Sequence, residues 1–151
     1  MKAIVLYSTK TGNTEKVAKA ISNALKMDYI NINSTNDLTR LNFNEYDLFI
    51  IGSGVYGGNP HKKLMQFLKQ LKFSSQKTIA IFLTWLGRGK SDNDAFKIIK
   101  NIISAKNQIV NENYYKCYGK SFLFIRKSHP DKKDFEAAIQ WANTILHNIR
   151  P

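Results

Sequence analysis

The chain has 151 residues, a length typical of one domain, and 43% of them are hydrophobic, enough for a core without covalent cross-links. Its single cysteine, Cys117, excludes an intramolecular disulfide framework and any multi-cysteine metal or iron–sulfur site. Since a lone thiol fits a reducing compartment and no apolar run approaches the roughly 18 residues that span a bilayer, we expect a single cytoplasmic domain over residues 1–151 without a membrane span.

The net charge of +12 raises the question of a nucleic-acid partner. The lysines are scattered, however, and form no run longer than a pair such as Lys62-Lys63. Only four of the 23 cationic residues are arginines, whereas side chains that read phosphates and bases favour arginine. We therefore expect no nucleic-acid binding, and interpret the cations as solvated helix faces or as a surface for an acidic partner.

Strands and helices alternate along the chain. In chain order the expected elements are a strand at 2–7, a helix from Thr14, strands at 28–32 and 47–52, a helix at 61–71, a strand at 78–84, a helix at 92–105, a last strand at 114–118 continuing at 122–125, and a helix that begins with Pro130. Alternation with short loops gives right-handed crossovers, so we expect an α/β fold: a doubly wound, five-stranded parallel sheet with helices on both faces.

Three polar or glycine-containing loops follow expected central strands, at residues 8–14, 53–60 and 85–91. In open α/β sheets, ligands bind outside the carboxyl ends of the strands, at the point where the strand order reverses. The sequence therefore predicts one binding site built from three loops.

The first loop has the composition of a phosphate site. Its residues are Ser8, Thr9, Lys10, Thr11, Gly12, Asn13 and Thr14. Unpaired N–H groups and the dipole at a helix start favour an anion, and hydroxyls donate hydrogen bonds without adding charge. The loop matches neither G-x-x-x-x-G-K-[ST] nor G-x-G-x-x-G, which favours a phosphomonoester over a nucleoside triphosphate. The alternative is a polar turn with an ordinary N-cap, for which the same residue types are common.

Residues 6–21, LYSTKTGNTEKVAKAI, closely resemble the signature of flavodoxins, which hold the phosphate of FMN in this loop. The resemblance continues through 51–68, IGSGVYGGNPHKKLMQFL, which is similar to the second flavin loop and its helix, and through 118–120 and 129–142. It implies FMN as cofactor and a flavodoxin-like fold with strand order 2-1-3-4-5. The length is similar to that of short-chain flavodoxins.

The resemblance also implies flavin contacts in the other two loops. In the second loop it assigns the ring of Tyr56 to the isoalloxazine, Gly57 to a peptide turn that needs φ above zero, and Asn59 to the pyrimidine edge. In the third loop Trp85 is the available second ring, although it could instead point into the core. The remaining residues of the expected cofactor site are Ser53, Gly54, Val55, Gly58, Thr84, Leu86 and Gly87.

No pattern indicates a metal site or a catalytic side chain. The histidines, His61, His129 and His147, are not spaced as metal ligands and are interpreted as capping or surface residues. Cys117, in an expected strand without a nearby histidine, is interpreted as a buried structural thiol, and Trp141 as a packing residue of the last helix.

FMN can hold zero, one or two electrons, and flavodoxins pass electrons between redox partner proteins. Family members are typically acidic, whereas this chain carries +12. Lysines near the flavin would raise its potential and steer the protein toward an acidic docking surface. We expect a monomeric electron carrier with acidic redox partners. The alternative is an FMN-dependent oxidoreductase of the quinone or protoporphyrinogen type, although the long basic loop of the latter has no counterpart in this chain.

Overall fold

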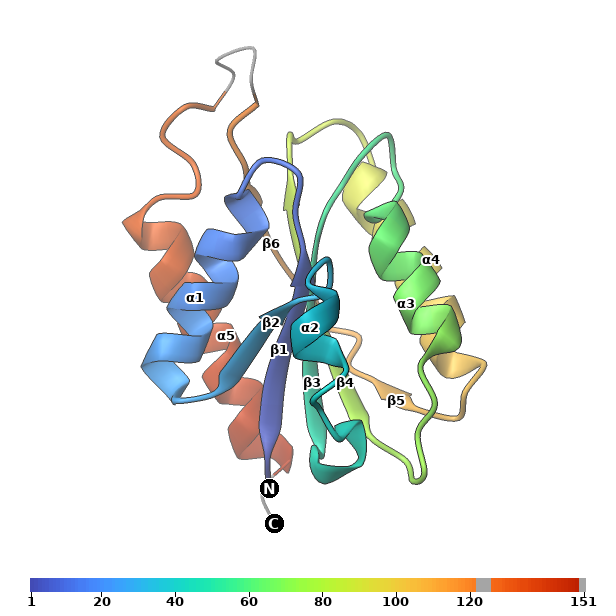
Figure 1. Ribbon diagram of the computed structural model, residues 1–151. Coiled ribbons are helices and arrows are strands. Elements are labelled where there is room, and N and C mark those ends of the chain that lie inside the picture. Colours follow the sequence, from blue (N-terminus) through green and yellow to red (C-terminus); the bar gives the residue numbers. More distant parts are fainter. Residues whose placement is uncertain (122–125, 150–151) are drawn as a thin grey trace.

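A computed structural model describes residues 1–121 and 126–149, without the side chains of residues 35 and 36. The elements alternate as expected along the chain (Figure 1). They are β1 (Ala3–Ser8), α1 (Asn13–Leu25), β2 (Asp28–Asn31), α2 (Thr35–Leu38), a 3-10 turn η1 (Phe43–Glu45), β3 (Leu48–Gly54), α3 (Lys62–Gln70), β4 (Thr78–Trp85), α4 (Ser91–Ser104), β5 (Ile109–Val110), β6 (Tyr115–Tyr118) and α5 (Lys132–Ile149).

The sheet is parallel and has the order β2-β1-β3-β4-β5, which confirms the expected topology. β6 also pairs in parallel with β4, opposite Phe82 to Trp85, whereas β5 pairs opposite Thr78 and Ile79. β5 and β6 therefore form one edge of the sheet as two segments. Between them the side-chain oxygen of Asn111 accepts a hydrogen bond from the backbone N–H of Asn113, a local turn that interrupts the strand.

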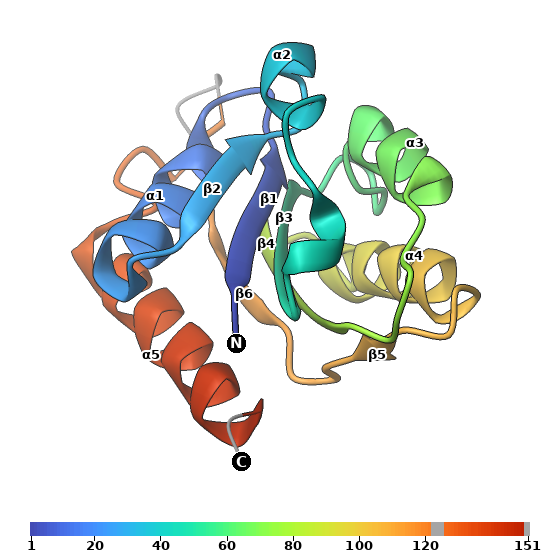
Figure 2. The same ribbon diagram turned by 60° about the horizontal axis from the view of Figure 1, so that its bottom comes forward.

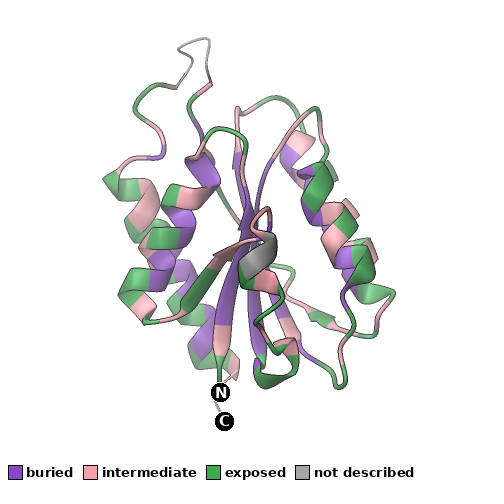
Figure 3. Ribbon diagram, viewed as in Figure 1, coloured by how far each residue is buried: buried purple, intermediate pink, exposed green. Residues whose placement is uncertain are grey.

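Helices cover both faces of the sheet, with α1 and α5 on one side and α3 and α4 on the other (Figure 2). Because successive strand side chains point to opposite faces, β1 contributes Ile4 and Leu6 to the core under α3 and α4, and Val5 to the core under α1 and α5. All seven residues of β3 are buried, as the apolar runs of a strand covered on both faces predict (Figure 3).

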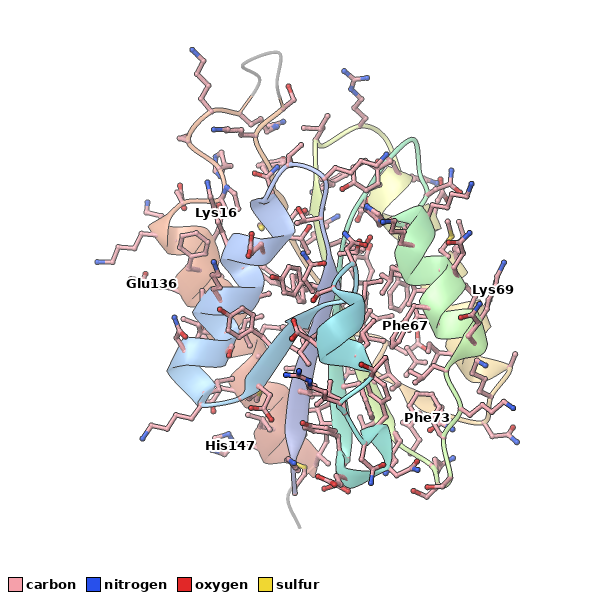
Figure 4. The ribbon with its side chains drawn as sticks, viewed as in Figure 1. Lys16, Phe67, Lys69, Phe73, Glu136 and His147 are labelled. Atoms are coloured by element: carbon pink, nitrogen blue, oxygen red, sulfur yellow. The ribbon has the colours of Figure 1, made fainter. Side chains whose placement is uncertain are left out.

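The outer helix faces carry charged side chains. Lys16, Lys69 and Glu136 are exposed and project from α1, α3 and α5 (Figure 4). This agrees with the interpretation of many lysines as residues of solvated helix faces. Among the described residues, no helix is both long and apolar enough to cross a membrane.

Several boundaries differ from the sequence prediction. The last helix begins at Lys132 and not at Pro130, because Asp131 and Asp134 exchange side-chain and backbone hydrogen bonds and so define its start. The short elements α2, η1 and β5 were not expected, since two to four residues carry no clear periodicity. The predicted strand segment 122–125 lies outside the described residues.

Candidate cofactor site

The carboxyl ends of β1, β3, β4 and β6 lie at one edge of the sheet, at the top of Figure 1. A cavity of about 270 Å³ opens between the loops that follow them. It is lined by Lys10, Thr11, Asn13, Gly54, Val55, Tyr56, Thr84, Trp85, Leu86, Gly119, Lys120 and Ser121. The structure thus brings residues of all three predicted loops to one cavity. A larger hollow of about 780 Å³ beside β2 is bordered by none of these loops, so we do not assign the cofactor to it.

The first loop leaves the start of α1 open. Gly12 is the N-cap residue with φ +84°, and no described side chain caps the helix. The hydroxyl oxygen of Thr9 accepts a hydrogen bond from the Gly12 N–H at 2.9 Å, and that of Thr11 accepts one from Nδ2 of Asn13 at 2.9 Å. Because both oxygens act as acceptors, the O–H groups of Thr9 and Thr11 can be donors to a further group.

Asn13 ties the first loop to the segment that follows β6. Its Nδ2 also donates to the backbone oxygen of Lys120 at 2.9 Å, while its buried Oδ1 has no hydrogen-bond partner among the described residues. A Cβ atom on Gly119 would lie 2.6 Å from Nδ2 of Asn13, so only glycine permits this approach. The contact joins residues 107 positions apart in the chain.

The two buried hydroxyls at the ends of the first loop bind to neighbouring segments. Ser8 donates to Oδ1 of Asn33 at 3.3 Å, beyond the end of β2. Oγ1 of Thr14 lies 2.9 Å from Oγ1 of Thr84. Of these residues only Thr84 lines the cavity, and the side chains of Ser8 and Thr14 hold the loop between its neighbours.

A tight turn forms the second loop. Tyr56 and Asn59 pair through two backbone hydrogen bonds, and Gly57 and Gly58 between them have φ of +59° and +79°. The prediction that Gly57 needs a positive φ is confirmed. The side chain of Asn59 donates to the backbone oxygen of Gly57 at 3.2 Å and does not line the cavity, so its contact with a flavin stays a prediction.

Tyr56 forms one wall of the cavity and connects the first two loops. Its hydroxyl accepts a hydrogen bond from the backbone N–H of Lys10 at 3.2 Å, and Nζ of Lys10 lies 4.4 Å from its ring centroid. A Cβ atom on Gly54 would lie 2.4 Å from the Tyr56 hydroxyl, so glycine makes room for it. Burial raises the pKa of the Tyr56 phenol, which keeps it neutral near pH 7. Beneath the loop, Oγ of Ser53 accepts from the backbone N–H of His61.

Trp85 lines the same cavity as Tyr56 and comes from the third loop. It is half-buried, lines the cavity and therefore does not belong to the core, which was the alternative from the sequence. Its ring stacks on that of Tyr118, with centroids 6.0 Å apart. Gly87, at φ +77°, passes so close to Tyr118 that a Cβ would lie 2.7 Å from the ring. The loop is also held by Nε of Arg126, which donates to the backbone oxygen of Leu86 at 3.3 Å.

Sequence reasoning did not assign Gly119, Lys120 and Ser121 to the site. They follow β6 and line the same cavity, and the buried hydroxyl of Ser121 has no hydrogen-bond partner among the described residues. A usable signal was present, because a glycine and a serine lie in the break of the last expected strand, directly after residue 118.

The other singled-out residues have structural roles. His61 is the N-cap of α3, and its Nδ1 accepts from the Lys63 N–H at 3.2 Å. Cys117 is buried in β6, where burial raises the pKa of its thiol to about 12. Trp141 is buried and donates from Nε1 to the backbone oxygen of Asn113 at 2.7 Å. His129 lies 2.7 Å from a carboxylate oxygen of Asp134, which already caps α5. These findings confirm the capping interpretation of His61 and the packing interpretations of Cys117 and Trp141, whereas His129 pairs with a capping residue and is not itself a cap.

Comparisons with known proteins agree with this geometry. A family model described as a flavodoxin domain matches residues 4–123. An uncharacterised protein of Methanocaldococcus jannaschii is 33% identical over 156 residues, covering 98% of this chain and 100% of its own. The flavodoxin-like domain-containing protein BilS of Clostridioides difficile is 32% identical over 124 residues, covering 80% of this chain and 67% of its own. Oxidised flavodoxin 1 of Bacillus cereus superposes with a TM-score of 0.75 at 16% identity, covering 99% and 100% of the two chains, which shows the same fold. Since the family model spans most of the sequence, the chain belongs to the flavodoxin domain family.

Proposed function

We propose that the chain binds FMN between its three loops and carries electrons between redox partner proteins. The observation that carries this proposal is the uncapped start of α1, which adjoins a cavity walled by two aromatic rings. Family membership supports the same conclusion.

The residues of the first loop fit a phosphomonoester. A helix start supplies backbone N–H groups without intrahelical partners and a partial positive charge. A Cβ atom on Gly12 would meet nothing within 4 Å, so there is free space directly over the loop. The O–H groups of Thr9 and Thr11 add donors. The buried Ser121 hydroxyl, which has no hydrogen-bond partner among the described residues, is a further possible donor.

The walls of the cavity fit a flat aromatic ring. Tyr56 and Trp85 come from different loops and line the same space, which allows an aromatic system between them to be shielded from water on both faces. Bound FMN supplies a ring that accepts and releases one or two electrons. The protein contributes the two rings, the backbone groups of the loops and the surrounding charge.

The charge around the cavity is positive. Lys10 and Lys120 are exposed and line it, and Arg88 and Lys90 are exposed on the third loop. Such a rim would stabilise a reduced, negatively charged flavin and attract a partner with an acidic docking surface. We infer that the redox partners present carboxylates around their own redox centres.

Reconstitution tests the cofactor first. Protein purified with FMN should be yellow, and the flavin that it releases on denaturation should be FMN. Stopped-flow oxidation of the reduced protein by an acidic protein acceptor and by a soluble quinone, over a salt series, then tests the function. Transfer to the protein should slow steeply, since the Debye length falls from about 10 Å at 0.1 M salt to about 3 Å at 1 M.

Two variants sharpen the test. Lys120→Gln should slow transfer to the acidic acceptor at low salt, whereas Lys69→Gln, on the outer face of α3, should not (Figure 4). Fast, saturable quinone reduction that is indifferent to salt, together with slow transfer to every protein acceptor, would instead support the oxidoreductase alternative.

A further inference from the structure

A buried carboxylate directly follows the third loop in the chain. Asp92, in the first turn of α4, is only 3% exposed. It accepts hydrogen bonds from the hydroxyl of Tyr114 at 2.7 Å and from Nζ of Lys116 at 2.6 Å. Buried carboxylates are rare without a specific partner, and here both partners come from the segment that forms the sheet edge beside β4.

The position of this carboxylate is fixed from the core side. The ring of Tyr114 stacks on that of Phe96, with centroids 4.4 Å apart and planes inclined by 19°. Burial disfavours the charged form of Asp92, but the hydrogen bonds from Lys116 and Tyr114 outweigh it and lower the pKa of the carboxyl. The start of α4 adds a favourable dipole. Asp92 is therefore a fixed negative charge at neutral pH.

Lys116 links this fixed carboxylate to Trp85 in the cavity wall. Its side chain is 45% exposed, and a lysine so placed normally samples many rotamers. The bond to Asp92 confines it instead, and its Nζ lies 4.6 Å from the centroid of the Trp85 ring. Tyr118, two residues further along β6, contacts the same ring. Trp85 is thus held by two side chains from one face of β6.

We propose that Asp92 and Lys116 act as a positioning pair that sets the orientation of the Trp85 ring against the flavin. Because the two opposite charges balance each other, Asp92 also reduces the electrostatic effect of Lys116 on the flavin. This rests on the proposed function. The pair belongs to neither the phosphate loop nor the exposed cationic rim. Its two charges should therefore affect the flavin in opposite directions when either is removed alone.

The expected effects follow from charge balance. Asp92→Asn leaves the Lys116 cation without its counter-charge and should favour the reduced flavin. Lys116→Met leaves the carboxylate and should disfavour it. A tenfold change in the one-electron reduction equilibrium, which is about 59 mV, is the size expected for Asp92→Asn. In the double variant the two charge effects should cancel, so its shift should be smaller than that of either single variant.

The experiment measures flavin midpoint potentials of the FMN-loaded wild type and variants. Lys100→Met is the matched control, because Lys100, on α4, also pairs with a carboxylate at 2.6 Å, that of Glu112, and neither residue lines the cavity. Shifts of opposite sign for Asp92→Asn and Lys116→Met, with a smaller shift in the double variant than in either single variant, support the pair. Shifts of the same sign, or none beyond that of Lys100→Met, overturn it.

A second readout needs no flavin. Quenching of tryptophan fluorescence by neutral acrylamide in the apoprotein should increase in Lys116→Met, because Trp85 loses its cover while Trp141 stays buried. Unchanged quenching would contradict the positioning role. Failure of the wild type to bind FMN would overturn the proposed function, and leave this apoprotein result to judge the pair separately.

Discussion

The starts of α1 and α5 differ in whether their own side chains accept hydrogen bonds from the backbone N–H groups at the helix start. At α5, Oδ1 of Asp131 accepts from the Asp134 N–H at 3.0 Å, and Oδ2 of Asp134 accepts from the Asp131 N–H at 2.8 Å, a reciprocal capping box. At α1, glycine occupies the N-cap position and no described side chain caps the helix. One helix start is closed by its own side chains, whereas the other has no side-chain cap among the described residues, which leaves its N–H groups available to a ligand.

The difference lies in which residue occupies the N-cap position and in where the neighbouring side chains point, and not in the overall polar composition. The first loop is richer in capping residue types than the start of α5. Yet its hydroxyl oxygens bind inside the loop, as Thr11 does with Asn13 and Thr9 with the N–H of Gly12. Polar composition alone therefore fits both a cap and a binding loop. Gly12 at the N-cap position distinguishes them, because it contributes no side chain to close the helix.

The largest effect should come from placing a negative charge in the open helix start. Asn13→Asp should weaken FMN binding by about a hundredfold, because a carboxylate near a phosphate in a partly buried site costs about 3 kcal/mol. Riboflavin, which lacks the phosphate, should lose much less. Fluorescence titration of both ligands measures this, with thermal unfolding of the apoprotein as a check on folding. Equal losses for both ligands would place the phosphate elsewhere.

Removing one donor from the same loop should have a smaller effect. Thr11→Val keeps the shape of the side chain but deletes the O–H, and a hydrogen bond to a charged group contributes roughly 1.5–3 kcal/mol. Since Thr11 is exposed, we expect the lower end, about a tenfold loss of FMN affinity. Thr11→Ser keeps the hydroxyl and should bind FMN nearly as the wild type does. If the serine variant is as weak as the valine variant, the hydroxyl is not the donor.

A change at the closed start of α5 should lower the stability of the protein but leave FMN binding unchanged. Asp134→Ala removes the acceptor for the Asp131 N–H and for His129, and should lower the free energy of unfolding by about 1 kcal/mol. FMN affinity should not change. Urea unfolding measures the loss, and Glu136→Ala, on the exposed face of the same helix, should have little effect. Weaker FMN binding in Asp134→Ala would show that the two helix starts are coupled.

The sequence predicts the central part of the fold well, because long apolar runs and helical spacing are local signals. It predicts the three loops and their common edge for the same reason. The sequence does not predict contacts between segments that are far apart in the chain. Nothing local shows that Asn13 binds the Lys120 backbone, that Ser8 turns to Asn33, or that Asp92 pairs with Lys116. These contacts depend on the register between strands, which fixes what each residue meets across the sheet.

The fifth strand shows the same limit. A run of two residues, Ile109–Val110, is too short to give a periodic signal, so β5 was not expected. The turn at Asn111 then restarts the edge as β6, whose end brings Gly119 against Asn13. The part of the site that sequence reasoning missed is therefore the part that depends on this interrupted edge.

The start of α3 provides a third case, since a titratable group caps it. Nδ1 of His61 accepts from the Lys63 N–H, which only the neutral imidazole can do. Burial lowers the pKa of His61 from its usual 6.5, and the nearby charges of Lys10 and Lys63 lower it further. The unfolded chain therefore binds a proton at a higher pH than the folded chain does. The stabilisation from the neutral cap is complete above pH 6.5 and is lost as the pH falls from there through the folded pKa.

His61→Asn should remove this pH dependence, because asparagine is a strong N-cap residue that does not titrate. Urea unfolding at about pH 8 and at about pH 5 measures it. The wild type should lose more stability between the two conditions than the variant does, by an amount smaller than the loss expected for Asp134→Ala. Equal losses in both proteins would mean that the cap of α3 does not titrate in this range. His61 is 7% exposed, and its ring lies edge-on to the Tyr56 ring with centroids 5.8 Å apart. Acid would therefore act on a closed helix start beside a wall of the cavity.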